Sequence, residues 1–539
     1  MENISPEKQD FTGFYFFQKY GSRIGSKSEK LPKGVSFFDN LRIKEALHRN
    51  SEISEFLLLK GDLTGIQEFI YSDIQKSKVG GSRGIAKRVR GKSFFVSLLT
   101  DLLAETYLDS LGLPLWNLIF AGGGHFNLLI PKEENTETEI FEITKEINLY
   151  LQNLLSFRLG LITAVEDCKN NIETDAADSF KGVNKERNVL KFKQFQGYLD
   201  DVFSTKPDSK TEKFNKICEK IGGIIPHSKY LIQLKNDGKI KETDSVKRLW
   251  FFKPKNQQFT RTTLMVRGKD DDGKTEDALD RILDFLEKNK SEIQETEISV
   301  INDTDFLKDA QVFRDFDFPV GFGFRFIGKA TPTHEEGELL EFGELAGFNY
   351  KDPKTKDSNY ESDFYKQLSI MRLDVDDLGA IFGDGLKKGN PNGKVDIRQI
   401  AALSREMSLF FTGHFNELAE EYGVYVVYSG GDDAFVIGSW LNIIDFSKAL
   451  VRDFKTFTNH NKDLHFKYSG YTFGLRYCLV EIFKRDQDLY DEILATINKG
   501  ILMNYQEVQD FWKSYENPIE PVFEKTFDNF LKANNQSDG

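Results

Sequence analysis

An acidic cluster late in the chain has the residue types and spacing to bind metal ions. Gly430-Gly431-Asp432-Asp433 lies between two strongly β-forming runs, and Asp374 follows another apolar run. This pattern predicts a β-hairpin with two aspartates at its tip and a strand ending at Asp374 beside it. Three carboxylates that converge at one sheet edge repel each other unless a cation is present. Because Mg²⁺ prefers carboxylate oxygens and substrate phosphates, the pattern predicts a divalent metal site.

The chemistry that such a site favours is nucleotidyl transfer on a palm domain. Gly430 and Gly431 have no side chains, so a triphosphate can approach the backbone closely. Two ions could lower the pKa of an attacking 3′-hydroxyl and stabilise the leaving pyrophosphate. The alternative is an ordinary turn, since Gly and Asp are common turn residues. A second acidic cluster after a strand favours the metal site; it consists of Asp374, Asp376 and Asp377.

An internal repeat places these residues in a larger plan. Asp62 follows the apolar run FLLLKG, and Asp374 follows a similar run. When the two aspartates are aligned, FAGGGH (120–125) falls opposite YSGGDD (428–433). The spacing is similar in both copies: 60 residues from Asp62 to Gly122 and 56 from Asp374 to Gly430. Each copy predicts a strand, an amphipathic helix and a hairpin. We therefore expect two copies of one α+β domain, of which only the second keeps both hairpin aspartates.

Other polar residues admit two interpretations each. The run Lys76–Lys92 holds seven Lys/Arg and no acid, which fits either a phosphate contact or a solvated surface loop. His125 follows three glycines, and we interpret it as a tip residue facing a nucleotide rather than a metal ligand. His414 falls on the apolar face of the helix expected over 397–423, so we expect it in the core.

Composition narrows the class of protein. The 539 residues are 39% hydrophobic and 29% charged, which is typical of a globular protein of several domains. A net charge of −13 argues against a protein that coats nucleic acid by bulk charge. The sequence contains no apolar run of transmembrane length and no signal peptide, and its three distant cysteines fit no disulfide framework. We therefore expect a cytoplasmic protein without a membrane partner.

The motifs together resemble a known family. GDLTGIQEFIY (61–71), RVRGKSFFVSLL (88–99) and NLIFAGGGHFNLLIP (117–131) are similar to the first palm of the large subunit of type III CRISPR effector complexes. MRLDVDDLGAIF (371–382) and VYSGGDDAFVIGSW (427–440) are similar to its second palm. Among the branches of this family, the motif sequences are most similar to those of the III-A (Csm) branch. The resemblance implies an α+β fold with two ferredoxin-like palms of the nucleotide-cyclase type, joined by a mixed linker region and followed by a short helical tail.

With these motifs as landmarks, the expected organisation has five parts. They are an N-terminal segment (1–54), a degenerate first palm (55–131), a linker region (132–340), the second palm (341–480) and a short helical C-terminal region (481–539). Members of the family often begin with an HD nuclease domain. No histidine here is followed by Asp, so we expect no such domain and no DNA cleavage by this sequence.

The resemblance also implies a function. Such subunits work in a ribonucleoprotein with guide RNA and Csm-type backbone subunits, and target RNA activates them to make cyclic oligoadenylates from ATP. Carried over, Asp374, Asp432 and Asp433 would be catalytic and hold Mg²⁺ or Mn²⁺, and Ser429, Gly430 and Gly431 would line the donor ATP. Gly122, Gly123 and Asp62 would lie near the second ATP. The alternatives are a conjugate of AMP with S-adenosylmethionine as product, or an inactive scaffold.

Overall fold

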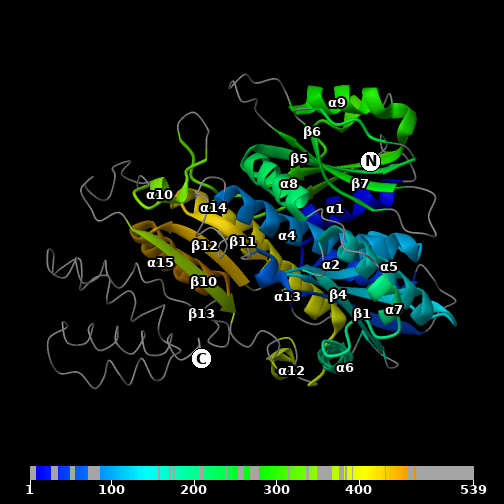
Figure 1. Ribbon diagram of the computed structural model, residues 1–539. Coiled ribbons are helices and arrows are strands. Elements are labelled where there is room, and N and C mark those ends of the chain that lie inside the picture. Colours follow the sequence, from blue (N-terminus) through cyan, green and yellow to red (C-terminus); the bar gives the residue numbers. More distant parts are fainter. Residues whose placement is uncertain are drawn as a thin grey trace, which may run out of the picture. The chain divides into compact units, whose positions relative to one another are not determined.

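The computed structural model describes most of the chain up to residue 468. The described residues are 8–25, 34–48, 55–70, 85–155, 158–168, 172–173, 176–204, 211–237, 239–243, 246–252, 260–267, 278–313, 316–334, 339–348, 367–375, 382, 385–390, 393–430, 433–458 and 466–468. They fall into two compact units, one from 1–329 with 379–413 and the other from 330–378 with 414–539. Both units combine helices with small sheets (Figure 1), which confirms the predicted α+β class.

The first unit contains two sheets and most of the helices. Its helices are α1 (Gln9–Gly21), α2 (Phe37–His48), α4 (Ile85–Ser110), α5 (Thr136–Leu155), α6 (Ala176–Leu190), α7 (Leu199–Ser204), α8 (Thr211–Ile224), α9 (Ala278–Asn289), α12 (Leu386–Gly389) and α13 (Ile397–Leu409), with short 3₁₀ turns at Leu115–Asn117, Ile225–His227, Lys290–Glu292 and Ala310–Phe313. Within the described residues, no helix of either unit has the length and apolarity needed to cross a membrane.

The first sheet has the strand order β2-β3-β1-β4. Its strands are β1 (Phe56–Thr64), β2 (Leu118–Gly122), β3 (His125–Pro131) and β4 (Gly160–Asp167). Leu57, Leu58 and Leu59 of β1 are almost fully buried, as the apolar run predicts. The fourth strand comes after α5, so the sheet continues beyond the boundary at residue 131 that the sequence suggested.

The second unit is built on a sheet of order β11-β12-β10-β13. The strands are β10 (Leu368–Val375), β11 (Tyr425–Gly430), β12 (Asp433–Ser439) and β13 (Phe466–Tyr468), and the helices are α10 (Phe342–Leu345), α14 (Phe415–Glu421) and α15 (Trp440–Phe457). Ser439 caps α15 by accepting a hydrogen bond from the backbone N–H of Asn442. The expected tail at 481–539 and most of the strand expected at 468–480 lie outside the described residues.

The two four-stranded sheets confirm the internal repeat. They share one strand order and one antiparallel register: Asp62 pairs with His125 as Asp374 pairs with Asp433. Each hairpin also has a register shift at the same place, between Leu118 and Phe120 in one and between Val426 and Tyr428 in the other. The alignment of FAGGGH with YSGGDD is therefore correct residue by residue at its described positions.

A five-stranded sheet occupies the region that the sequence left as a linker. Its order is β6-β7-β5-β8-β9, with β5 (Ser228–Asn236), β6 (Val246–Phe252), β7 (Thr260–Arg267), β8 (Ile293–Ile301) and β9 (Val320–Arg325). Helix α1 packs on β9, where the backbone N–H of Phe322 donates to the Thr12 hydroxyl at 3.0 Å. The predicted N-terminal segment is therefore part of this core.

The long helix α4 corrects the interpretation of the basic run at 76–92. The helix begins at Ile85, so the second half of that run is helical. Arg90 and Lys92 are buried: Arg90 donates to the carbonyl of Gly222 at 3.3 Å, and the Lys92 ammonium lies 5.3 Å from the centre of the Phe69 ring. Arg88 pairs with Glu219 at 3.0 Å. These cations therefore serve packing, and the prediction of a phosphate-binding or solvated loop is wrong for them.

The π-helical turn at Phe410–His414 corrects the assignment of His414. This turn separates α13 from α14, where the sequence predicted one continuous helix. A π turn adds one residue and so rotates the following helix by about 100°. As a result, His414 leaves the apolar face: its side chain is 42% exposed and pairs with Asp453 at 3.0 Å.

Helix α13 lies in the first unit, although the sequence placed it in the second palm. It begins with a capping box in which the Asp396 side chain accepts from backbone N–H groups and Gln399 reaches back to the Asp396 N–H. Its residues Ile397, Ile400 and Ala401 are buried against α2 and the first sheet, in a cluster that includes Ile43 and Leu129. The chain between β10 and β11 therefore supplies core to the first unit.

The crossing of α4 and α8 predicts opposite effects for two neighbouring glycines. A Cβ at Gly222 would lie 1.8 Å from the carbonyl oxygen of Lys87, whereas a Cβ at Gly223 would meet nothing within 4 Å. We expect Gly222→Ala to lower the free energy of unfolding by about 1–3 kcal/mol through overpacking. Gly223→Ala should be neutral or raise it by up to about 1 kcal/mol through helix propensity. Urea denaturation of both variants measures this, and equal effects would contradict the close crossing.

Candidate functional site

The second sheet brings two of the predicted catalytic aspartates together. In the antiparallel pair of β10 and β12, Asp374 lies directly opposite Asp433. In the hairpin, Gly430 also lies opposite Asp433. Like charges at directly opposed positions destabilise a sheet unless a cation compensates them. The backbone register therefore places two of the three predicted ligand positions side by side.

The two aspartate positions lie on the face of the sheet away from α15. Met371 contacts α15, because its sulfur accepts a hydrogen bond from the Ser447 hydroxyl at 2.9 Å. Successive strand residues alternate between faces, so positions 370, 372 and 374 belong to the opposite face. Ile370 on that face is 37% exposed. Tyr428 and Phe435, paired across the hairpin, stack on this face with ring centres 6.1 Å apart.

The register assigns Ser429 to the other face. Ser429 pairs with Ala434, which itself pairs with Leu373, and both of these partners are fully buried. Its hydroxyl is buried and has no hydrogen-bond partner among the described residues. For Ser429 we therefore keep only the prediction that its backbone lines the donor ATP. Gly430 lies opposite Asp433 at the hairpin tip.

Part of the predicted metal site falls on residues that are not described. Gly431, Asp432, Asp376 and Asp377 lie outside the described residues. Among the residues that are described, no group of three or more His, Cys, Asp or Glu is placed to hold a metal ion. In the described backbone register two aspartate positions lie opposite each other and next to a glycine, and aspartate is a residue type that Mg²⁺ prefers as a ligand.

The first sheet has the same geometry with a different set of residues. Gly122 lies opposite His125, and Asp62 lies opposite His125 on the other side. Gly123 and Gly124 have φ of 59° and 82°, the left-handed pair that a two-residue hairpin turn requires. At the φ of Gly124, a side chain such as the aspartate found at the equivalent position of the other copy would strain the backbone, and its Cβ would displace the end of the Ile66 side chain, 2.3 Å away.

Cationic side chains from α6 occupy the Asp62 face of this sheet. Val183 packs on Leu58 and Ala164, which places α6 over β1 and β4. From this position Arg187 and Lys191 form ion pairs with Asp62 at 3.3 and 3.0 Å. Lys60 donates to Asn184 at 2.8 Å. The charge of Asp62 is thus balanced by cations of the protein. In the second sheet, by contrast, the equivalent Asp374 lies opposite another aspartate.

Sequence reasoning missed Arg187 and Lys191. Their four-residue spacing puts both on one face of a helix end, which is visible in the sequence. The sequence does not show which strand that face covers, because α6 follows β1 by more than a hundred residues. Only the packing of α6 on the first sheet identifies Asp62 as their partner.

His125 is expected to remain neutral well below the usual range. Desolvation of its ring and, to a lesser extent, the charge of Lys60 lower its pKa to about 3, although Asp62 opposes them. An ordinary imidazole titrates near pH 6.5, so the stability that neutral His125 contributes is present above about pH 6.5 and is lost as the pH falls towards 3. From pH 7 to pH 5 the wild type should lose at most about 2 kcal/mol more than His125→Gln. Urea denaturation at both pH values tests this, and parallel losses would contradict it.

The two sheets together have one acidic and one charge-balanced hairpin. The acidic one presents opposed aspartates beside a glycine, which suits metal-assisted chemistry on phosphates. The other presents a neutral histidine, glycines and an aspartate already paired with two cations. A nucleotide can be held there by cations and backbone, but the residues do not fit a second metal centre.

Comparison with family models supports these assignments. Residues 55–208 match the model of the Csm1 subunit domain B, and residues 367–493 match the second palm domain of Cas10/Cmr2. Residues 456–539 match a family described as a protein of unknown function, DUF3810. The first two matches cover the two four-stranded sheets.

Relatives with similar sequences carry a common description. A Streptococcus thermophilus protein is 24% identical over 418 residues, covering 76% of this chain and 48% of the relative. A Methanocaldococcus jannaschii protein is 27% identical over 456 residues, covering 76% and 52%. Both are described as the CRISPR system single-strand-specific deoxyribonuclease Cas10/Csm1 of subtype III-A. The chain thus spans about half the length of these relatives.

Solved structures share the fold. A Csm1–Csm4 subcomplex of the type III-A CRISPR-Csm interference complex superposes with a TM-score of 0.56 at 20% identity, covering 85% of this chain and 58% of the other. A Csm1–Csm4 cassette in complex with one ATP gives 0.58 at 21% identity, covering 89% and 61%. The same cassette with cA4 gives 0.58 at 19% identity, covering 90% and 61%.

Proposed function

This chain is a homologue of the Cas10/Csm1 large subunit of type III-A CRISPR systems, and from that premise we propose that it makes cyclic oligoadenylates from ATP. The reaction is a nucleotidyl transfer at the second palm, switched on when a guide-RNA complex binds target RNA. The observation that carries the proposal is the register of β10 and β12, in which Asp374 lies opposite Asp433. A scaffold gains nothing from two opposed aspartates, since their repulsion costs stability.

The proposed metal ligands are Asp374, Asp432 and Asp433, and the ions are Mg²⁺ or Mn²⁺. When bound, these ions would neutralise the triphosphate and activate the attacking 3′-hydroxyl. The backbone of Ser429, Gly430 and Gly431 lines the donor ATP, because a glycine tip leaves room for phosphates. Tyr428 and Phe435 stack on the same face of the sheet as the two aspartate positions and form one side of the space next to them.

The second ATP is proposed to lie at the first palm, near Gly122, Gly123 and Asp62. Arg187 and Lys191 already pair with Asp62, so this side offers cations rather than metal ligands. Neutral His125 adds no charge there. One palm therefore activates the reacting phosphate, and the other positions the acceptor through cations and backbone.

Partners and regulation follow from the same family premise. We propose that the chain works in the cytoplasm with guide RNA, target RNA and Csm-type backbone subunits, among them a Csm4-like protein such as the one in the structural relatives. Target binding is proposed to shift the palms towards an arrangement that aligns two ATP molecules. The sequence holds no His-Asp dipeptide, so no deoxyribonuclease step is assigned to these residues.

Product analysis tests the proposal directly. The chain is assembled with its guide complex and given ATP, Mg²⁺ or Mn²⁺, S-adenosylmethionine and target RNA, and the products are resolved by mass spectrometry. We expect cyclic adenylates that require target RNA and disappear in the Asp432→Ala, Asp433→Ala double variant. A conjugate of AMP with S-adenosylmethionine would keep the metal site and change the acceptor. No nucleotide product in any condition would overturn the proposal in favour of a scaffold.

A further inference from the structure

A partly polar cavity lies inside the first unit, along strand β2 of its hairpin. Its volume is about 180 Å³, and α1, α2, α4, β2, β9 and α13 contribute to its walls. Aromatic rings form much of the lining, among them Phe14, Phe120 and Phe326. The guanidinium groups of Arg42 and Arg405 also line it. None of the nine predicted catalytic and nucleotide-binding residues does so.

Arg42 is buried without a hydrogen-bond acceptor. Its side chain is 6% exposed, and its Nε and Nη2 atoms have no hydrogen-bond partner in the described part of the chain. Its ion-pair partner is Asp39, whose Oδ1 lies 4.0 Å from Nη2, beyond hydrogen-bond range. The Arg42 guanidinium also lies over the ring of Phe38, 5.4 Å from its centre. A buried guanidinium with free N–H groups is costly unless an acceptor reaches it.

Asp39 leaves Arg42 without a hydrogen bond in this geometry, while other groups donate to both of its oxygens. Arg405 donates to Oδ1 at 3.1 Å and to Oδ2 at 2.9 Å, and the Ser36 hydroxyl donates to Oδ2 at 2.5 Å. Two buried arginines therefore share one carboxylate. Burial lowers the pKa of Arg42 to about 10, with Arg405 adding to the effect, so the group is still charged at neutral pH.

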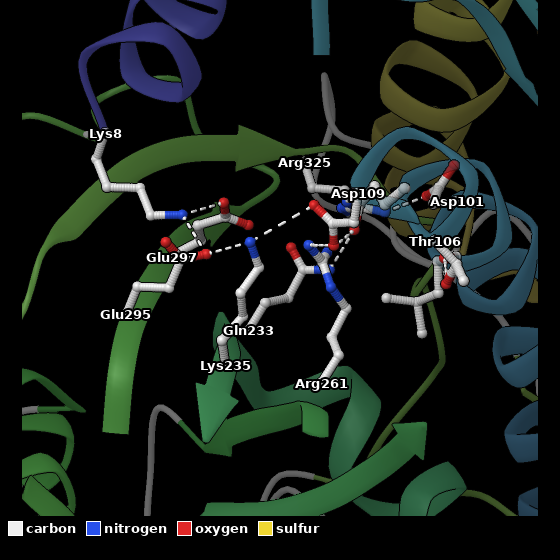
Figure 2. A network of polar contacts seen from close by, with 12 residues as sticks. Lys8, Asp101, Thr106, Asp109, Gln233, Lys235, Arg261, Glu295, Glu297 and Arg325 are labelled. Carbon is white, nitrogen blue, oxygen red and sulfur yellow. Dashed lines mark hydrogen bonds and ion pairs between the residues drawn. The ribbon is translucent and has the colours of Figure 1, made fainter. Parts of the chain in front are cut away.

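The acidic residues at the other end of the cavity are also occupied. Asp101 and Glu105 of α4 hold Arg325 of β9, and Glu105 also holds Arg261 at 2.9 Å. Figure 2 shows this network continuing through Asp109 and Lys235 to Glu295 and Lys8. Its members face one another, so no carboxylate from this network is shown to reach Arg42.

We propose that the cavity binds a small ring compound with one oxyanion group, a carboxylate or a phosphate, held by Arg42 and Arg405 between aromatic side chains. The anion would supply the acceptors that Arg42 lacks, and the guanidinium fork matches the geometry of a carboxylate or phosphate. A cavity of about 150 Å³ accommodates benzene. At about 180 Å³, this one has room for a single ring with one anionic group but not for a nucleoside triphosphate.

Calorimetry with benzoate tests the site on the full chain. We expect benzoate to bind with a Kd of about 1 mM or below. Benzamide has the same shape without the charge and should bind at least about tenfold more weakly. Phenyl phosphate in a parallel titration separates the two sources of the oxyanion, since the tighter of the two ligands identifies the preferred group. Absence of benzoate and phenyl phosphate binding to the wild type would overturn the proposal.

Three variants separate the site from general stability. Arg42→Met should fold with an unchanged or higher Tm, because it removes an uncompensated charge, and should lose benzoate binding. Ser408→Phe keeps Arg42 but fills the lining, and should also lose binding. Arg23→Met is the matched control: its side chain is 70% exposed and it is not in the lining, so binding should equal that of the wild type. Undiminished binding by Arg42→Met would assign the ligand to another site and overturn the proposal.

Discussion

Replacing Asp374 by asparagine is expected to lower nucleotide product formation by about 10³-fold, which corresponds to about 4 kcal/mol of transition-state stabilisation. The same change at the register-equivalent Asp62 should cost less than about tenfold. The reason is the difference in charge balance. Asp374 lies opposite another aspartate and is proposed to bind a metal ion, whereas Asp62 is paired with Arg187 and Lys191.

The measurement is the initial rate of product formation by the assembled complex with target RNA and saturating ATP. Asp445→Asn is the matched control, since Asp445 lies on α15 and pairs with Lys448 at 3.5 Å. It should retain the wild-type rate. Equal losses at Asp374 and Asp62 would mean that both palms bind metal, which contradicts the charge-balanced first sheet. Full activity of Asp374→Asn would remove this residue from the metal site.

Replacing Arg325 by methionine is expected to destabilise the first unit by about 3–5 kcal/mol, because it leaves buried carboxylates without their partner. Arg325 is the cation shared by Asp101 and Glu105, where α4 meets the five-stranded sheet (Figure 2). Native-state hydrogen exchange of β8 and β9 measures the loss in this unit alone. Lys288→Met removes an exposed pair with Asp284 and should change stability by less than about 0.5 kcal/mol.

The pH dependence gives the Arg325→Met prediction a second readout. Burial raises the pKa of Asp101 and of Glu105; without Arg325 no cation opposes the rise for Asp101, whereas Arg261 still opposes it for Glu105. A carboxyl group with a raised pKa favours folding when protonated, so the penalty is full at high pH and shrinks as the pH falls. The variant should therefore recover part of its loss between pH 8 and pH 5, and adding Asp101→Leu should recover part of it at all pH values. A pH-independent loss would assign the effect to packing.

The sequence by itself determined the repeat and the position of its acidic residues. Strand patterns and turn residues are local properties of a sequence. The strands that end near Asp62 and Asp374, and the glycine turns of the two hairpins, could therefore be predicted directly. One strand–helix–hairpin plan repeated at nearly equal spacing was enough to pair FAGGGH with YSGGDD, and the register of both sheets agrees. The resemblance to the second palm rested on the same residues.

Only the tertiary structure decided what surrounds those residues. A strand pattern does not specify its neighbours, so the five-stranded sheet in 228–325 could not be assembled from sequence. Helical periodicity assumes a constant pitch, and the π turn at Phe410–His414 therefore moved His414 out of the core. The basic run at 76–92 looked solvated because burial of Arg90 and Lys92 depends on α8 and Phe69, which contact them only in the fold.

The difference between the two palms likewise has one part that the sequence shows and another that only the tertiary structure shows. The loss of both hairpin aspartates and the gain of His125 in the first copy are visible in the sequence. The cations that balance Asp62 come from α6, and the guanidinium left without an acceptor at Arg42 results from two arginines sharing Asp39. Charge balance depends on distances between segments far apart in the chain, and only packing fixes those distances.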